Sequence, residues 1–298
     1  MFKALAPLLA AATLALAASA AGPGADAPAL LSQTDLFGAD GEPAPGVVAF
    51  EPQHPLWSDG ADKRRWIRLP AGATIDTRSP DAWRFPPGTQ LWKEFRHGTR
   101  VETRYMALGR DGRWRFASYR WSADGADALR VDDAGAAAQP VAGAPGGRYD
   151  FPSLDDCQAC HGGARSPVLG FSAVQLGPQL AAAMQRGWLT RAPRAWALQP
   201  PQAPGATEVE RAARGYLHGN CAHCHHAAGV PRPLRLALDA DGRAAPVPDL
   251  ARVLRRMGTR DPYRQMPPVG TRHLDAAGLA LVQAWADTLT PAPKEPLP

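Results

Sequence analysis

The feature that most constrains this chain is a five-residue pattern that occurs twice. Two cysteines separated by two residues are followed at once by a histidine, at 157–161 and again at 221–225. The chain has four cysteines in all, so both pairs belong to the pattern and none is left over. Four cysteines could also form a two-disulfide framework, but such a framework does not explain the histidine after each pair.

Cys-x-x-Cys-His is the attachment sequence of c-type haem. The two thiols add to the two vinyl groups of one haem, and the imidazole that follows lies beneath the iron. We therefore expect two covalently attached haems, one at each pair. The residues expected to hold them are Cys157, Cys160, Cys221 and Cys224 as thioether anchors, with His161 and His225 as proximal iron ligands.

Two other interpretations of the cysteines stay open. A Cys-x-x-Cys pair can be a redox disulfide, although that motif belongs to a strand-then-helix context and does not account for the histidine. Four thiols can also form a structural zinc site, which does not require Cys-x-x-Cys-His twice.

The N-terminus has the pattern of a secretory signal peptide. Lys3 precedes an apolar run over residues 4–17, and small residues follow at 18–20, which predicts a signal over 1–20 that is cleaved after Ala20. The run is shorter than the about 20 residues that span a bilayer. We expect an exported, periplasmic protein whose mature chain has no transmembrane segment. The 33 basic and 28 acidic residues are interspersed, so nothing supports nucleic-acid binding.

The chain is expected to be an α+β protein, with a β-rich N-terminal domain followed by a mainly helical haem domain. The expected segments are a disordered lead-in over 21–45, a β-rich domain over 46–147, a first haem-attachment segment over 148–200, a helical haem domain over 205–290 and an extended tail over 291–298. Proline- and glycine-rich stretches over 133–147 and 198–205 are expected to be linkers or surface loops.

The β-rich domain contains six of the nine tryptophans, between Trp57 and Trp121. Alternating residues over 101–107 and 114–116 flank an Asp-Gly turn at 111–112, which predicts a hairpin. Further strands are expected at 65–69 and 89–95. The tryptophans are expected to fill the interior of the sheet structure. The alternative is that they contact a carbohydrate or a dehydrogenase partner.

The last ninety residues predict three helices. Thr207 and Glu210 form a capping-box pattern before an apolar helical face that ends near Gly219. A second helix is expected from about Asp249 to Arg256, and Met257 is expected to complete its apolar face as a core residue. A third begins near residue 275 and carries Trp285, and a segment at 179–185 is also expected to be helical.

Each haem iron has a sixth coordination position. Met266 is the expected distal ligand of the second haem, because it follows His225 by 41 residues in a proline-bounded loop. For the first haem no distal ligand is identified, and the position is either filled or open. The residues considered for it are Met184, Met106, His97, His54 and Lys93. His223 and His226 are expected at the surface or in support of the attachment histidine.

The stretch 207–289 resembles a class I cytochrome c domain. It has an N-terminal helix, Cys-x-x-Cys-His, a Met266-Pro267 loop and a final helix with an aromatic residue. In that family a glycine and an aromatic residue of the first helix pack across the last helix, and Gly215-Tyr216 are similar to that pair. The wider chain resembles a family of bacterial exported dihaem c-type cytochromes. The residues that carry this likeness are 55–61, 85–89, 102–104, 118–121 and the two cysteine motifs.

The resemblance implies a dihaem electron-transfer protein with other redox proteins as partners, more than it implies an enzyme. Two alternatives remain. One is a peroxidase-like dihaem enzyme with an open haem at His161. The other is an electron-accepting subunit that docks on a periplasmic dehydrogenase through the β-rich domain.

Overall fold

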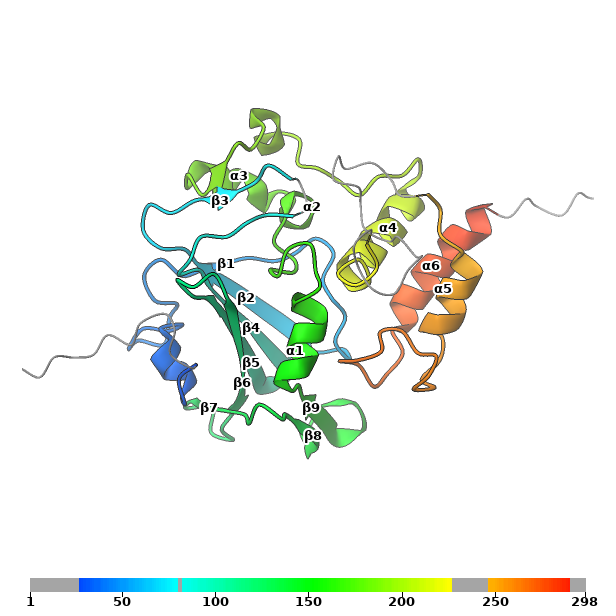
Figure 1. Ribbon diagram of the computed structural model, residues 1–298. Helices are drawn as coiled ribbons and strands as arrows, with labels where there is room; N and C mark the ends of the chain where they lie inside the picture. The colour runs from blue at the N-terminus through cyan, green and yellow to red at the C-terminus, as the bar shows by residue number, and fades with distance from the viewer. Residues whose placement is uncertain (1–26, 80–81, 227–245, 290–298) are drawn as a thin grey trace, which may run out of the picture.

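The computed structural model describes residues 27–79, 82–226 and 246–289. An antiparallel sheet occupies the first half of the described chain and helices follow it (Figure 1). The α+β fold class expected from the sequence is therefore confirmed. The expected signal peptide over 1–20 and the expected tail over 291–298 lie outside the described residues. In the part of the chain that the structure describes, no helix is long and apolar enough to cross a membrane.

The main sheet has six strands in the order β1-β2-β4-β5-β6-β7, with antiparallel neighbours throughout. The strands are β1 (Val48–Ala49), β2 (Asp62–Arg68), β4 (Gln90–His97), β5 (Thr99–Leu108), β6 (Trp114–Trp121) and β7 (Ala128–Arg130). The expected hairpin is confirmed as β5 and β6, which turn through residues 109–113. The strands expected at 65–69 and 89–95 are confirmed as β2 and β4.

Two small strand pairs flank the main sheet. β3 (Ile75–Asp76) pairs in parallel with β10 (Leu189–Thr190), and β8 (Ala136–Pro140) pairs antiparallel with β9 (Arg148–Phe151). The stretch 133–147, which we expected to be a linker, thus contains a strand. The glycine- and alanine-rich sequence does not predict a strand by itself, and β8 forms because its backbone pairs with that of β9.

Both faces of the sheet are covered. One face packs Trp66, Trp92 and Trp121 with Tyr119, and the other packs Ile67, Leu91 and Met106 against the α2 and α3 region. Trp83 is buried in this second cluster. Four of the six tryptophans of the domain are therefore 8% exposed or less, as expected of core residues rather than of ligand contacts.

The lead-in was expected to be disordered over 21–45. In its described part, from residue 27 onward, the short helix η1 (Leu31–Thr34) instead packs on the tryptophan face of the sheet. Leu31 and Leu36 are buried there, and Trp92 Nε1 donates to Thr34 Oγ1 at 2.9 Å. Three leucines among many alanines, glycines and prolines give too weak a periodic signal to identify this contact in advance.

Three short helices follow β9. They are α1 (Leu154–His161), α2 (Ala173–Leu176) and α3 (Gln179–Gln185), with η2 (Pro145–Gly147) before β9 and η3 (Arg194–Ala197) after β10. α1 lies across the face of the sheet, and α2 and α3 lie above one end of it (Figure 1). The helix expected at 179–185 is confirmed as α3.

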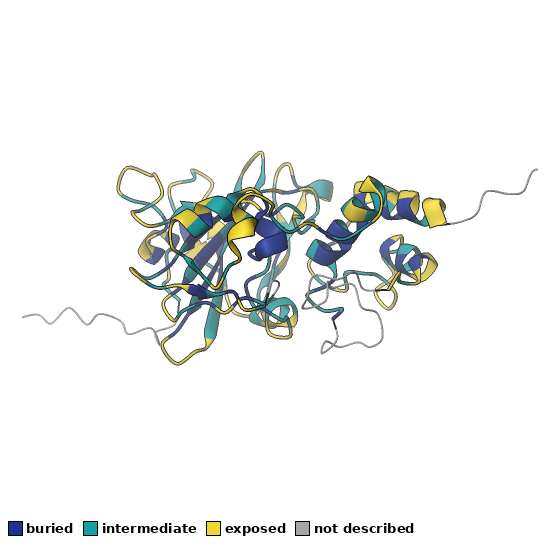
Figure 2. Ribbon diagram, turned by 90° about the horizontal axis from the view of Figure 1, so that it is seen from above, coloured by how far each residue is buried: buried dark blue, intermediate teal, exposed yellow. Residues whose placement is uncertain are grey.

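The last three helices form a separate layer beside the sheet: α4 (Glu208–Asn220), α5 (Leu250–Met257) and α6 (Ala276–Leu289). Thr207 Oγ1 accepts from Glu210 N at 3.1 Å and Asp249 Oδ1 from Arg252 N at 2.9 Å, so both expected N-caps are confirmed. The buried sides of the three helices face one another (Figure 2). Met257 and Trp285 belong to this core, and Tyr216 packs on Gly278 of α6.

The loop between β1 and β2 contacts the helical layer over residues 53–59, and we call this stretch the connecting loop. Its start is held by α2, where Gln53 Nε2 donates to Val174 O at 2.6 Å. Its end is held by the helical layer, because Trp57 N donates to Asn220 Oδ1 at 2.8 Å and Asp59 accepts from the backbone N–H of Arg272. The two parts of the molecule are therefore joined through side chains as well as through the chain.

Candidate functional site

The first Cys-x-x-Cys-His motif lies on α1. Ser153 caps this helix: its Oγ accepts from Asp156 N at 3.1 Å, and Asp156 Oδ2 accepts from Ser153 N at 3.0 Å. Because residues three and four apart share one side of a helix, the cap places Cys157, Cys160 and His161 on the same face. That face is turned toward the sheet.

A cavity of about 1120 Å³, measured with its open mouth, lies between α1 and the sheet. All three motif residues line it, together with apolar side chains of the sheet such as Leu91, Met106 and Phe116. The far side is formed by His54 and Leu56 of the connecting loop and by the end of α4. The lining is mostly apolar, so an apolar group attached to the two thiols would lie against the side chains of the sheet.

His161 is arranged as a metal-binding imidazole. Its Nδ1 lies 2.6 Å from Pro167 O. A carbonyl oxygen only accepts, so Nδ1 carries the proton and Nε2 keeps a free lone pair. Burial lowers the pKa of His161 to about 4, so the ring is neutral at pH 7. The first site therefore offers two thiols and a correctly oriented neutral imidazole on one wall of a cavity.

The second motif follows the end of α4. His225 N donates to Cys221 O at 2.9 Å and Cys224 N to the same oxygen at 3.2 Å, so a tight turn gathers the motif. His225 Nδ1 is buried and has no hydrogen-bond partner among the described residues. Burial also lowers the pKa of His225. A desolvated, unpartnered imidazole next to two thiols fits the donor set of a second haem.

Met266 is brought close to this motif. It lines a cavity of about 410 Å³ together with Cys221, Tyr216 and Met257, and its backbone N donates to Arg256 O at 3.0 Å. His225 is not among the described residues that line this cavity. The structure thus joins Met266 with one thiol of the second motif and leaves its role as iron ligand a prediction.

The two motifs contact each other although 64 residues separate Cys157 from Cys221. Cys224 Sγ lies 3.9 Å from Ala159 O, and His226 Nε2 lies 2.9 Å from Gly163 O. His226 is buried in this contact, which excludes the surface position for it, and its support of the attachment histidine stays a prediction.

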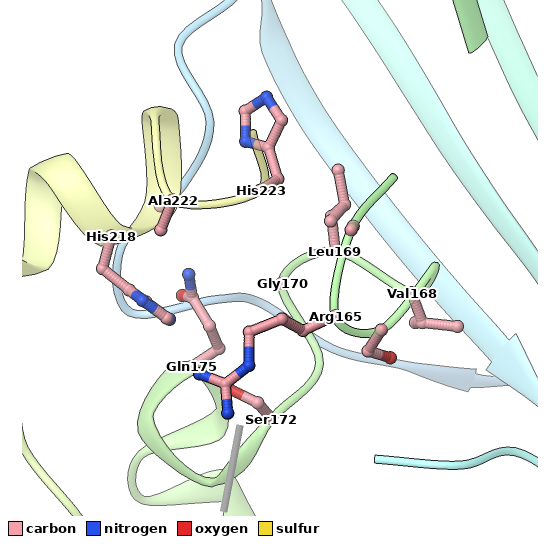
Figure 3. A pocket seen from close by; sticks show the side chains of 12 residues that line it. Arg165, Val168, Leu169, Gly170, Ser172, Gln175, His218, Ala222 and His223 are labelled. Atoms are coloured by element: carbon pink, nitrogen blue, oxygen red, sulfur yellow. The ribbon is translucent and has the colours of Figure 1, made fainter. Parts of the chain in front are cut away.

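A smaller cavity of about 480 Å³ lies between the loop after the first motif and the end of α4. The side chains of Arg165, Gln175 and His218 converge in it (Figure 3). His223 also lines this cavity, and burial, followed by coupling to the imidazoles of His161 and His225, lowers its pKa to about 4.

The four cysteines are unpaired, and burial raises the pKa of each thiol above its ordinary value, to about 11 for Cys157 and about 12 for Cys221. A redox-active Cys-x-x-Cys pair needs the opposite shift, because the attacking species is a thiolate. The redox-disulfide interpretation is therefore the less favoured one. Within the described residues no group of three or more His, Cys, Asp or Glu side chains is placed to hold a metal ion, and a haem iron requires no such group.

The residues considered as a distal ligand of the first haem divide into two groups. Met106, His54 and Lys93 line the first cavity. Met184 lies on α3, partly buried against the core, and His97 lies at another cavity, with its ring 5.9 Å from that of Tyr149.

His54 belongs to the connecting loop, and its ring packs on α4. A Cβ added at Gly215 would overlap this ring, and one added at Gly219 would overlap the His54 carbonyl oxygen. His54 N donates to Gln175 Oε1 at 3.1 Å, which fixes the loop, and its Nε2 is buried without a partner among the described residues.

Sequence reasoning considered Lys93 alone and missed that it lies in a group of basic side chains on the cavity wall. Arg65 of β2, Lys93 of β4 and Arg104 of β5 all line the first cavity. Glu102 accepts from Arg104 Nε at 2.9 Å, from Tyr149 OH at 2.6 Å and from Ser118 Oγ at 2.5 Å. Strand alternation marks these residues as one face, but it does not reveal that α1 covers that face.

Comparison of the chain with models of known protein families, with curated proteins and with solved structures finds no match. The functional argument therefore depends on the residues of the site.

Proposed function

We propose that this protein is a dihaem c-type cytochrome that transfers single electrons between redox partners. The observation that carries the proposal is the contact between the two Cys-x-x-Cys-His motifs, with Cys224 Sγ 3.9 Å from Ala159 O. Residues of each motif line a cavity, and burial lowers the pKa of both histidines below its ordinary value.

The residues of this chain have distinct parts in the proposal. Cys157, Cys160, Cys221 and Cys224 anchor the two haems through thioether bonds, and His161 and His225 ligate the irons. When bound, each haem supplies an iron that takes up and returns one electron. The chain orients the two groups, keeps water from them and sets their potentials through ligands and nearby charges.

Met266 is proposed as the second ligand of the iron at His225. A thioether in this position raises the reduction potential relative to a second imidazole. The alanine variant Met266→Ala is expected to lower the potential of that haem and to remove the long-wavelength sulfur-to-iron absorption band of the oxidised protein. Met257→Ala is the matched control, because Met257 lines the same cavity but belongs to the core of α4, α5 and α6.

The decisive experiment is a redox titration of the mature protein followed by electron paramagnetic resonance, with the intact mass measured on the same sample. Two haems and two one-electron transitions support the proposal. A mass that contains one haem or none contradicts it. Replacing Cys157 and Cys160 by serine should remove one haem and one transition while the second remains.

A second candidate function is a peroxidase-like enzyme with an open iron position at His161. The observation in its favour is the polar, basic wall of the first cavity, where Lys93 and Arg104 lie close enough to lower the pKa of His161. Rapid binding of carbon monoxide to the first haem together with peroxide turnover would favour this candidate. Export to the periplasm and docking on a dehydrogenase remain predictions, and residues 1–20 lie outside the described part of the chain.

A further inference from the structure

Three basic residues stand side by side on one face of the main sheet. Arg65 is the register partner of Lys93, and Lys93 is the register partner of Arg104, so the row crosses strands β2, β4 and β5 without a gap. All three side chains line the cavity that also contains Cys157, Cys160 and His161. We call these residues the basic row.

The acidic groups around the basic row do not balance it. Arg104 is paired with Glu102, and the charge of Glu51 acts on Arg65. Asp156 also lines the cavity, but its Oδ2 is used by the N–H and hydroxyl of Ser153.

The side chain of Lys93 makes no hydrogen bond or ion pair with any described residue, and its Nζ lies 4.8 Å from the centre of the Phe95 ring. Arg65 Nη2 is buried and also has no hydrogen-bond partner among the described residues. The middle of the basic row thus presents unused donors to the cavity.

This arrangement is costly for the fold alone. Like charges directly opposite each other in a sheet are destabilising, and a buried cation without a partner loses its hydration without compensation. Burial and the neighbouring Arg65 and Arg104 charges hold the pKa of Lys93 well below its ordinary value, in agreement with that cost. An anion in the cavity would accept hydrogen bonds from the row and offset the repulsion.

We propose that Arg65, Lys93 and Arg104 form an oxyanion-binding site on the wall of the first cavity. Its ligand is a carboxylate or a small oxyanion. Two sources provide this chemistry: a propionate carboxylate of the haem anchored at Cys157 and Cys160, or a free oxyanion from solution. The first source rests on the proposed function, whereas the second does not.

The test compares the mature protein with Lys93→Gln, Lys93→Arg and the control Lys63→Gln. Lys63 is the matched lysine: it lies on β2, two residues from Arg65, but donates to Leu56 O at 2.9 Å and does not line the cavity. Nitrite is the probe for a free oxyanion, with binding measured by calorimetry, which needs no haem signal. The midpoint potential of each haem is measured on the same samples, and the intact mass gives the haem content.

Two results support the proposal and separate the sources. Saturable nitrite binding that weakens at least tenfold in Lys93→Gln, but not in Lys93→Arg or Lys63→Gln, identifies a free oxyanion. A propionate is identified if nitrite does not bind and the midpoint potential of the first haem falls only in Lys93→Gln. The expected fall is about 59 mV, which is a tenfold change in the equilibrium constant of a one-electron couple.

Two results overturn it. One is that Lys93→Gln behaves like Lys63→Gln in both measurements. The other is that Lys93→Gln converts the first haem to a high-spin form that binds carbon monoxide, which would make Lys93 an iron ligand instead. If the mass shows no haem, the proposed function fails by itself, and nitrite binding alone then decides the oxyanion site.

Discussion

Glu102 is the position at which one substitution tests the packing of the first site most directly. Its side chain is fully buried and accepts three hydrogen bonds, from Ser118, Arg104 and Tyr149. Tyr149 belongs to β9, which leads into α1, so this carboxylate links the sheet to the helix that carries the first motif.

In Glu102→Gln the amide keeps the shape but loses the charge, and the guanidinium of Arg104, whose side chain is 31% exposed, loses its counter-ion. Because Arg104 stays partly hydrated, losing the carboxylate of this pair should cost less than in a fully buried pair, about 1–3 kcal/mol. For a chain of this size each kcal/mol corresponds to a fall of about 2–4 °C, so the unfolding temperature should drop by roughly 5 °C.

The assay is urea unfolding monitored by tryptophan fluorescence, because Trp66, Trp92 and Trp121 are buried in the same sheet. The control is Asp111→Asn, which makes the same chemical change in the ion pair between Asp111 and Arg115. The side chain of Asp111 is 45% exposed. That pair should be worth less than about 1 kcal/mol.

A double variant, Glu102→Gln with Arg104→Met, completes the test. Removing both charges should cost less than Glu102→Gln alone, because no unpaired cation remains. The reasoning is refuted if Glu102→Gln costs no more than Asp111→Asn, or if the double variant is less stable than the sum of its single changes.

Three further predictions concern the helical layer and its join to the sheet. Gly278→Ala places a methyl group against the ring of Tyr216, so it should destabilise the protein by about 1–3 kcal/mol. In a Tyr216→Ala background the same change should stabilise the protein instead. Equal effects in both backgrounds would contradict this packing. Burial, followed by the charge of Arg65, lowers the pKa of Lys63 to about 8, below its ordinary value of 10.5. Between pH 8 and 10.5 the unfolded chain therefore binds one more proton at this residue than the folded protein does. The stability of the folded protein should rise with pH over that range. Allowing for partial exposure, that rise should be about 1–2 kcal/mol in urea titrations and absent from Lys63→Met. Asp59→Asn weakens the charge-assisted bonds to the backbone N–H groups of Arg272 and His273 and should cost about 1–2 kcal/mol, whereas no measurable change in the unfolding midpoint would show that this contact does not hold the two parts together.

The elements that could be predicted from sequence carry local signals. The hairpin of β5 and β6 has alternation and an Asp-Gly turn, and the caps at Thr207 and Asp249 lie beside apolar helical faces. The cysteine motifs are local as well, because their spacing alone places the anchors and the histidine together. Their chemistry as haem sites remains a prediction.

What could not be predicted depends on contacts distant in sequence. Strand β8 exists because β9 pairs with it, and the basic row becomes buried because α1 covers its face. The contact between Ala159 and Cys224 likewise arises from tertiary packing. Neither alternation nor helical periodicity reports which element covers a given face.

The close approach of the connecting loop to α4 limits how this chain can be divided. Gly215 and Gly219 accommodate His54, while Gly219, Val269 and Gly270 form part of the wall of the first cavity. A cut in the proline-rich stretch 198–205 would therefore not release two self-sufficient pieces. The N-terminal piece would keep the first motif but lose one wall of its cavity, which would then be open to water. The C-terminal piece would expose the surface of α4 at Gly215 and Gly219 that His54 covers.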